Sequence, residues 1–192
     1  MATTKNADII LCEGITEKYY INSLRDILVV RPEVRPVKPY NMDELRCAIE
    51  ECAKVGYTAV HCLIDMDNKV NNAKNMAKYL KLKQKYNGEY VKKTECRVYF
   101  YESLPSIEIF FYYYFENSTA EKTNDGLKSW LKHKCGYETK PTFSFHNTFT
   151  RSGGCLKNAI SNSKNSVRLR LDKSYNCSYT EVSNLIEYLG LK

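Results

Sequence analysis

Residues 9–17 read IILCEGITE, and residues 60–67 read VHCLIDMD. In each stretch an apolar run of the length expected for a buried strand ends in carboxylate side chains. These acids are Glu13 and Glu17 after the first run, and Asp65 and Asp67 after the second. Open α/β sheets bind their ligands at the carboxyl ends of the strands. The two stretches therefore predict an α/β fold with four carboxylates at one edge of its sheet.

The first hundred residues alternate between strand and helix patterns. Strands are expected at 8–12, 57–64 and 96–101, and helices at 16–28, from 41 to about 55, and in the lysine-rich segment after 70. Asn41 followed by Glu44 is a helix N-cap pattern, and Gly56 is a typical helix stop. The unbroken apolar run 57–64 favours a central parallel strand. In the lysine-rich helix we expect Ala73, Met76, Ala77 and Leu80 to face the core.

The second half of the chain has a different pattern. The aromatic run 110–115 predicts a helix of about three turns that packs on more than one side; base stacking is the alternative for these rings. A final helix is expected to bury Val182, Leu185, Ile186 and Leu189 and to stop at Gly190. The prediction is a mostly parallel sheet flanked by helices in residues 1–104. Residues 105–192 are then a mainly helical elaboration packed on that core, within one compact domain.

Composition excludes several classes of protein. The 192 residues are 43% hydrophobic, and no apolar run approaches the ~18 residues of a membrane span. The N-terminal residues have no signal-peptide pattern. Eight cysteines occur without a C-x-x-C pair, which argues against a zinc ribbon and against a disulfide framework. We expect a reduced, cytoplasmic protein that does not bind membranes.

The positive charge is concentrated in one segment. The formal net charge is +7, and residues 71–93 contain seven lysines against one glutamate, a net +6. Such a stretch is either a solvated helix face or a surface that binds nucleic-acid phosphates. Its position just after the Asp65-x-Asp67 pair favours the second interpretation. The candidate phosphate-binding residues are Lys74, Lys78, Lys81, Lys85, Lys92 and Lys93.

Four converging carboxylates suit a hard divalent cation, with Mg²⁺ favoured and Mn²⁺ as an alternative. Without a cation the acids repel one another, and the pKa of one or two of them rises. Bound metal ions stabilise the attacking and leaving oxygens during in-line displacement at phosphorus. The acids therefore point to phosphodiester chemistry.

The residues also resemble a known family. The order of a strand-end Glu and a later Asp-x-Asp is similar to the Toprim fold of primases, topoisomerases and overcoming-lysogenization-defect nucleases. More narrowly, residues 12–20, CEGITEKYY, resemble the CEGxTEKxYF opening of the RloB-like family. Residues 103–110, SLPSIEIF, are similar to its SNPCFELW element, and residues 175–182, YNCSYTEV, to its NPxTxV segment. The chain departs from these patterns at Ser106, Phe110 and Cys177, where the family has Cys, Trp and Pro.

The resemblance implies a Mg²⁺-dependent Toprim-type endonuclease that serves as the effector of a bacterial antiviral (abortive-infection) system, often beside an AAA or ABC-type ATPase. By the same resemblance, Glu13, Asp65 and Asp67 are metal ligands or acid/base groups, and Glu17 is the further ligand of nuclease-type members. Glu108 matches a later family Glu that serves the metal site or a partner. Lys140 is the candidate for the lysine that stabilises charge on the reacting phosphoryl group.

Two functional hypotheses remain open. The first is a metal-dependent endonuclease acting on tRNA, other RNA or DNA. The second is a catalytically silent Toprim-like subunit that senses nucleic acid or a phage protein and regulates an ATPase. A homo-oligomer is compatible with both. The discriminating observation is whether Glu13, Glu17, Asp65 and Asp67 lie within reach of one or two cations.

Overall fold

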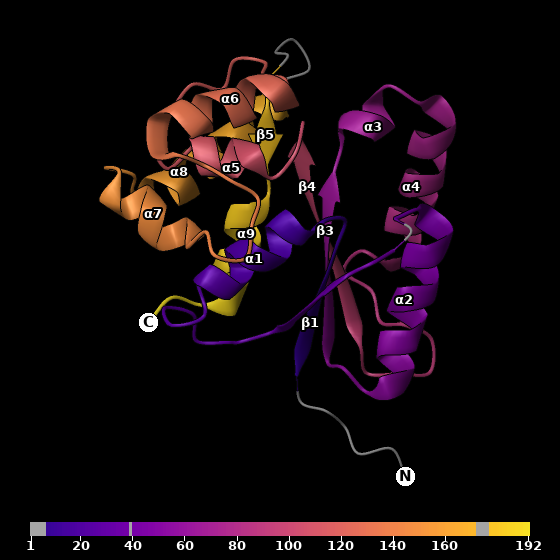
Figure 1. Cartoon of the computed structure of the whole chain (residues 1–192). Coiled ribbons are helices and arrows are strands. Elements are labelled where there is room, and N and C mark those ends of the chain that lie inside the picture. The colour runs from indigo at the N-terminus through magenta and orange to yellow at the C-terminus, as the bar shows by residue number, and fades with distance from the viewer. Residues whose placement is uncertain (1–6, 39, 172–176) are drawn as a thin grey trace.

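The computed structural model describes residues 7–38, 40–171 and 177–192. Within them, one sheet has the strand order β2-β1-β3-β4-β5 (Figure 1). Neighbouring strands from β2 to β4 are parallel, and β5 is antiparallel to β4. The strands are β1 (Asp8–Cys12), β2 (Glu33–Pro36), β3 (Ala59–Asp65), β4 (Arg97–Leu104) and β5 (Tyr179–Thr180). The predicted mostly parallel α/β sheet is confirmed, with β3 in its centre.

Helices cover both faces of the sheet. The helices on one face are α2 (Met42–Val55), α3 (Asp67–Val70) and α4 (Ala73–Tyr86) (Figure 1). The other face carries α1 (Ile15–Ser23), α5 (Glu108–Tyr112), α6 (Asn124–Cys135), α7 (Phe145–Arg151), α8 (Leu156–Arg170) and α9 (Val182–Leu189). Alternate residues of β1 reach the two sides: Ile9 and Leu11 pack toward α2 and α4, and Ile10 and Cys12 toward the other helices. None of the described helices is long and apolar enough to cross a membrane.

Helix α2 begins and ends where the sequence predicts. The Asn41 side chain accepts hydrogen bonds from the backbone N–H groups of Asp43 and Glu44. Gly56 ends the helix in the left-handed conformation, with φ at 97°, which glycine adopts without a steric penalty. Helix α9 likewise buries Val182, Leu185, Ile186 and Leu189, as predicted.

The structure corrects the predicted inward face of α4. Ala73, Ala77 and Leu80 are exposed, and Met76 is half-buried. The core-facing stripe is instead Tyr79, Leu82 and Tyr86. The two tyrosines bury their rings while their hydroxyls donate to Glu102 and Glu50, at 2.6 and 2.7 Å. Tyrosine can cover apolar surface in this way because its polar tip finds a partner.

Two further elements differ from the prediction. Helix α1 ends at Ser23, before the expected Leu28, and successive turns replace the last helical turns. The aromatic segment forms only a short helix, α5, in place of three turns. Pro39 and residues 172–176 lie outside the described residues. The second range includes Tyr175 and Asn176 of the predicted C-terminal motif.

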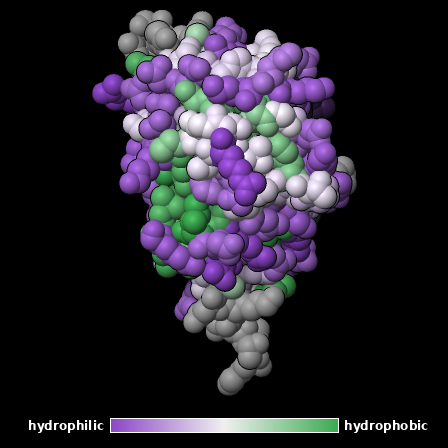
Figure 2. Space-filling view, turned by 60° about the vertical axis from the view of Figure 1, so that its left-hand side comes forward, coloured by the Kyte–Doolittle hydropathy of each residue, from purple (hydrophilic) through white to green (hydrophobic). Residues whose placement is uncertain are grey.

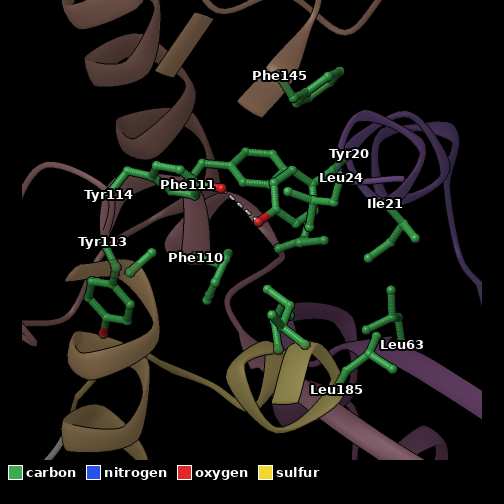
Figure 3. Close-up of a cluster of buried hydrophobic side chains, with 14 of the residues drawn as sticks. Tyr20, Ile21, Leu24, Leu63, Phe110, Phe111, Tyr113, Tyr114, Phe145 and Leu185 are labelled. Atoms are coloured by element: carbon green, nitrogen blue, oxygen red, sulfur yellow. Dashed lines mark hydrogen bonds between the residues drawn. The ribbon is translucent and has the colours of Figure 1, made fainter. Parts of the chain in front are cut away.

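The aromatic run forms part of the core between the sheet and the helical layer. Phe110, Phe111, Tyr113 and Tyr114 are fully buried, and Figure 3 shows Phe110, Phe111 and Tyr114 gathered with Tyr20 of α1. The hydroxyls of Tyr20 and Tyr114 lie 3.0 Å apart and share a hydrogen bond. Rings enclosed in this way have no free face for a nucleobase. The core interpretation is therefore confirmed for residues 110–114, whose rings are not available for base stacking, and Phe115 is half-buried against the same core.

The outer surface of the helical layer is mainly hydrophilic. Figure 2 shows polar side chains over most of this side of the molecule, with several green hydrophobic areas among them. Scattered apolar groups of this kind are normal on folded proteins.

Candidate active site

The acids predicted from sequence gather at the carboxyl edge of the parallel strands. Strands β1 and β3 pair in parallel, with Leu11 beside Cys62, and β3 pairs with β4, with Asp65 beside Ser103. Glu13 follows the end of β1, and Asp65 is the last residue of β3. We use the name acid cluster for Glu13, Glu17, Asp65, Asp67 and Glu108.

Glu13 faces a buried lysine. The Lys69 ammonium lies 3.5 Å from Glu13 Oε2 and donates to the backbone carbonyl oxygen of Asp65 at 2.5 Å. Burial raises the pKa of Glu13, while Lys69 lowers it in part and the Asp67 carboxylate raises it further. Lys69 is 5% exposed, so its charge acts with little screening by water.

Glu17 lies in the first turn of α1 and is 3% exposed. Its carboxylate accepts a hydrogen bond from the backbone N–H of Gly14 at 3.2 Å. Burial raises the pKa of Glu17 to about 7, and the carboxylates of Glu108 and Glu13 also raise it. At neutral pH this carboxyl is therefore divided between its protonated and ionised forms.

Asp65 is held by the chain that follows β4. Its Oδ1 accepts a hydrogen bond from the backbone N–H of Ile107 at 3.0 Å. Burial raises the pKa of Asp65 well above its ordinary value, and repulsion from Glu17 and Glu108 adds to this. Glu13 and Asp67 act on Asp65 in the same direction, so every other member of the acid cluster opposes its ionisation.

A hydrogen-bond network joins Asp67 to Glu108. Asn124 donates from its side-chain amide to Asp67 Oδ2, and the Asn124 carbonyl oxygen contacts the Ser106 hydroxyl. The same hydroxyl reaches Glu108 Oε2 at 2.8 Å, while Tyr137 donates to Glu108 Oε1 at 2.9 Å. Since a hydroxyl has one proton, Ser106 donates to Asn124 or to Glu108 at any moment. Lys128 also lies 3.8 Å from Glu108 Oε1.

A comparison with protein families places the chain. Residues 9–189 match the family model described as RloB-like protein. The chain belongs to the RloB-like family. No curated protein and no solved structure matches the chain.

Two family positions that differ in this chain lie close to the acid cluster or beneath it. Ser106, where the RloB-like pattern has Cys, supports Glu108 and contacts Asn124 through its hydroxyl. Phe110, where the pattern has Trp, is fully buried against Tyr20 and Tyr114 (Figure 3). Both substitutions leave the carboxylates of the cluster in place.

The acid cluster suits Mg²⁺ in ligand type, because carboxylate oxygens are hard donors. Like charges that raise one another's pKa are also the electrostatic setting that a divalent cation relieves. Yet across residues 7–38, 40–171 and 177–192, no three His, Cys, Asp or Glu side chains are placed to hold one ion together. In this conformation, protein donors occupy the carboxylates instead.

Lys140 lies on the surface. Its ammonium pairs with the Glu138 carboxylate, and both side chains are about half exposed. The described contacts of Lys140 do not include any member of the acid cluster. Its assignment as the lysine that stabilises the phosphoryl group stays a prediction.

The lysine-rich segment extends away from the acid cluster. Lys74 and Lys78 lie in the first turns of α4, and Lys78 pairs with Asp43 at 2.9 Å. Residues 87–90 bridge to the start of β4, at the opposite edge of the sheet from the acids. Lys92 and Lys93 follow these bridges and are exposed, as are Lys81 and Lys85 of α4. Only the first part of the stretch therefore adjoins the cluster among the described residues.

Sequence reasoning missed Lys69, Asn124 and Tyr137. Lys69 lies four residues after Asp65 but just outside the basic stretch, so its pattern resembles any surface lysine. Asn124 and Tyr137 come from the helical elaboration, and nothing in their local sequence links them to distant acids. Only the packing of the second half of the chain onto the sheet edge brings them there.

Proposed function

We propose that this chain is a Mg²⁺-dependent endonuclease that hydrolyses phosphodiester bonds of nucleic acid. The observation that carries the proposal is the gathering of five carboxylates at the ends of β1 and β3 and in the first turns of α1, α3 and α5. Structural ion pairs combine opposite charges, whereas these acids mainly oppose one another. A surplus of buried negative charge is costly to the fold and is typical of sites that bind a cation.

Glu13, Asp65 and Asp67 are the proposed ligands of Mg²⁺, with Mn²⁺ as a substitute, and Glu17 and Glu108 complete the set. When bound, the ion supplies a Lewis acid for the phosphoryl oxygens and stabilises the leaving oxygen. The residues of the chain have separate tasks. In the metal-free chain Glu17 is partly protonated near neutral pH and gives up this proton to become a ligand, the Lys69 ammonium attracts the phosphate, and the buried floor of the site limits water.

The biological setting follows from family membership and is part of the proposal. We propose that the chain acts as an effector of bacterial antiviral defence, alongside an AAA or ABC-type ATPase. The exposed lysines of α4 and of residues 92–93 are the proposed surface for nucleic-acid phosphates.

One observation favours a second candidate function. Every member of the acid cluster has a donor from the protein, and Lys69 adds a positive charge where a cation would reduce the repulsion. A chain that remained in this arrangement would be a silent regulatory subunit. An active nuclease must exchange some of these protein contacts for the ion, and release by a partner is one route to that exchange.

The test is cleavage of tRNA, single-stranded RNA and plasmid DNA with Mg²⁺ or Mn²⁺. Wild type is compared with Glu13→Gln, and Asp125→Asn of α6 is the matched control because this acid is exposed. Cleavage lost in Glu13→Gln and kept in Asp125→Asn supports the nuclease. Equal cleavage in all three proteins contradicts it. Metal binding without cleavage of any substrate, tested also with the proposed AAA or ABC-type ATPase partner added, supports the regulatory subunit.

A further inference from the structure

A pocket of about 190 Å³ opens beside Glu13. It lies between the first turns of α2 and α4, at the same edge of the sheet as the acid cluster. Its lining residues are Glu13, Tyr40, Asn41, Met42, Asn68, Lys69, Asn75 and Lys78. Because Asn68 and Asn75 are exposed, the pocket is accessible from solvent.

The lining combines an apolar wall with groups that form hydrogen bonds. Tyr40 and Met42 are half-buried, and the Tyr40 hydroxyl donates to the carbonyl oxygen of Leu63 at 3.3 Å, which fixes the ring. The side-chain amides of Asn68 and Asn75 are the polar part of the lining. In the described part of the chain, neither amide forms a hydrogen bond to another protein group. Each amide therefore offers both a donor and an acceptor to a ligand.

The lining of the pocket contains two lysines and one glutamate. Lys69 and Lys78 contribute positive charge, although Lys69 pairs with Glu13 at 3.5 Å and Lys78 with Asp43 at 2.9 Å, and Glu13 is the only carboxylate among the lining residues. The Lys69 ammonium lies between Glu13 and the end of β3, at the border between the pocket and the acid cluster. A ligand with a polar ring and an adjoining phosphate matches this arrangement: the ring fits among the amides, and the phosphate lies at the lysine border.

The volume limits the size of the ring. An engineered protein cavity of about 150 Å³ holds one benzene molecule. A pocket of about 190 Å³ therefore admits one six-membered ring with its polar substituents. A base in a stacked duplex cannot enter such a pocket, because the base must first leave the stack.

We propose that this pocket binds the pyrimidine base of an unpaired nucleotide whose phosphate adjoins the acid cluster. This inference rests on the proposed function and narrows its substrate class to single-stranded or looped nucleic acid with a pyrimidine at the cleavage position. The amides of Asn68 and Asn75 read the polar edge of the base, and Tyr40 supplies the apolar wall.

The experiment measures binding without catalysis. Fluorescence anisotropy in EDTA compares short single-stranded oligo(U), oligo(C), oligo(A) and oligo(dT) on wild type, Asn75→Leu and the control Asn147→Leu. Asn147 is an exposed helical asparagine of α7, so the control makes the same chemical change away from the pocket. A thermal melt of each variant verifies folding.

We expect oligo(U) and oligo(C) to bind at least about fivefold more tightly than oligo(A). Asn75→Leu is expected to weaken pyrimidine binding about tenfold, in line with the loss of one good base contact. Asn147→Leu is expected to change nothing. Oligo(dT) shows whether the sugar contributes, and a pyrimidine preference with either sugar supports the pocket.

Equal affinity for oligo(A) and oligo(U), or unchanged binding by folded Asn75→Leu, overturns the proposal. The result is separable from the nuclease test. Pyrimidine-selective binding without metal-dependent cleavage removes the proposed function and keeps the pocket, whereas cleavage without pyrimidine selectivity removes the pocket alone.

Discussion

Two regions of this protein bury glutamates, and they shift the pKa values of these residues in opposite directions. In the acid cluster, Glu17 is 3% exposed and its pKa rises to about 7. On β4, Glu102 is 2% exposed, and its pKa falls to about 2. Burial itself raises the pKa in both cases. The neighbours of each carboxylate therefore decide the outcome.

Glu102 has an excess of donors and cations around it. Lys83 and Arg170 pair with its two oxygens at 2.6 and 2.8 Å, and the hydroxyls of Tyr79 and Tyr179 donate at 2.6 and 2.9 Å. These contacts join β4 to α4, α8 and β5. We call this set the Glu102 network. The comparison teaches that a buried carboxylate surrounded by donors and cations stabilises the fold. A buried carboxylate surrounded by other carboxylates is repelled by them, and a bound cation can relieve this repulsion.

Replacing Asp65 by Asn is expected to have the largest effect. Asn keeps an oxygen for the Ile107 N–H but removes the charge that a metal needs. We expect cleavage to fall at least about 100-fold, the cost of losing one strong electrostatic group at a reacting centre. The melting temperature of the metal-free protein should stay equal or rise, because repulsion in the acid cluster falls. A folded Asp65→Asn variant with full cleavage activity would contradict the role of the acid cluster in metal binding. Asp125→Asn, the same change at an exposed acid, is the control.

Glu102→Gln is expected to give the opposite result. The change leaves Lys83 and Arg170 without their charged partner, and breaking a buried ion pair costs about 3–5 kcal/mol. Since the side chains of Lys83 and Arg170 are 26% and 39% exposed, water screens part of this loss, and about 3 kcal/mol is expected. Urea denaturation measures it. Glu187→Gln, which breaks the half-exposed pair with Lys164, should cost less than ~1 kcal/mol.

The pH dependence of stability sharpens the comparison. The pKa of Glu102 is depressed in the fold, so its contribution is present above about pH 4.5 and is lost as the pH falls toward about 2. The pKa of Glu17 is raised from 4.5 to about 7, so the fold loses stability as the pH rises through this window. At about 1.4 kcal/mol per unit, the Glu17 effect reaches up to about 3 kcal/mol.

Urea denaturation of the metal-free protein from pH 3 to pH 8 tests both signs. Glu17→Gln should make the decline above pH 4.5 shallower, since Asp65 and Glu13, whose pKa values are also raised, still contribute to it, and Glu102→Gln should flatten the rise below it. Glu121→Gln, at an exposed acid, should leave the profile unchanged. A Glu17→Gln profile that declines as steeply as wild type would show that Glu17 is not crowded.

Helices α2 and α4 and strand β3 show which parts of the fold the sequence could predict. Asn41 and Gly56 bound α2 through local hydrogen bonds and a left-handed φ, so their signals lie within a few residues. The apolar continuity of β3 likewise indicates its central position. The inward face of α4 was predicted wrongly, because Tyr79 depends on Glu102, which lies 23 residues further along the chain. Propensity and periodicity contain no information about such a partner.

The candidate site likewise contains residues that the sequence could predict and residues that it could not. The four acids after the first two apolar runs could be placed at one edge from the parallel order of strands alone. Lys69, Asn124 and the pocket beside Tyr40 could not, because each depends on how helices from different parts of the chain meet at that edge. The short edge strands β2 and β5 were also not predicted as strands, since their pairing is set by neighbours and not by local pattern.

Lys69→Met should give the smallest effect and tests whether the acid cluster lacks positive charge. Met fills similar space and leaves Glu13 without the ammonium that lies 3.5 Å away. The cluster then becomes more negative, so we expect Mn²⁺ to bind about tenfold more tightly in isothermal titration calorimetry, while cleavage falls because the phosphate loses a cation.

Lys128→Met is the control, because the half-exposed Lys128 lies 3.8 Å from Glu108 and is screened by water. Unchanged or weaker Mn²⁺ binding by folded Lys69→Met would mean that Lys69 does not oppose the metal. The contrast with the Glu102 network would then rest on repulsion among the carboxylates alone.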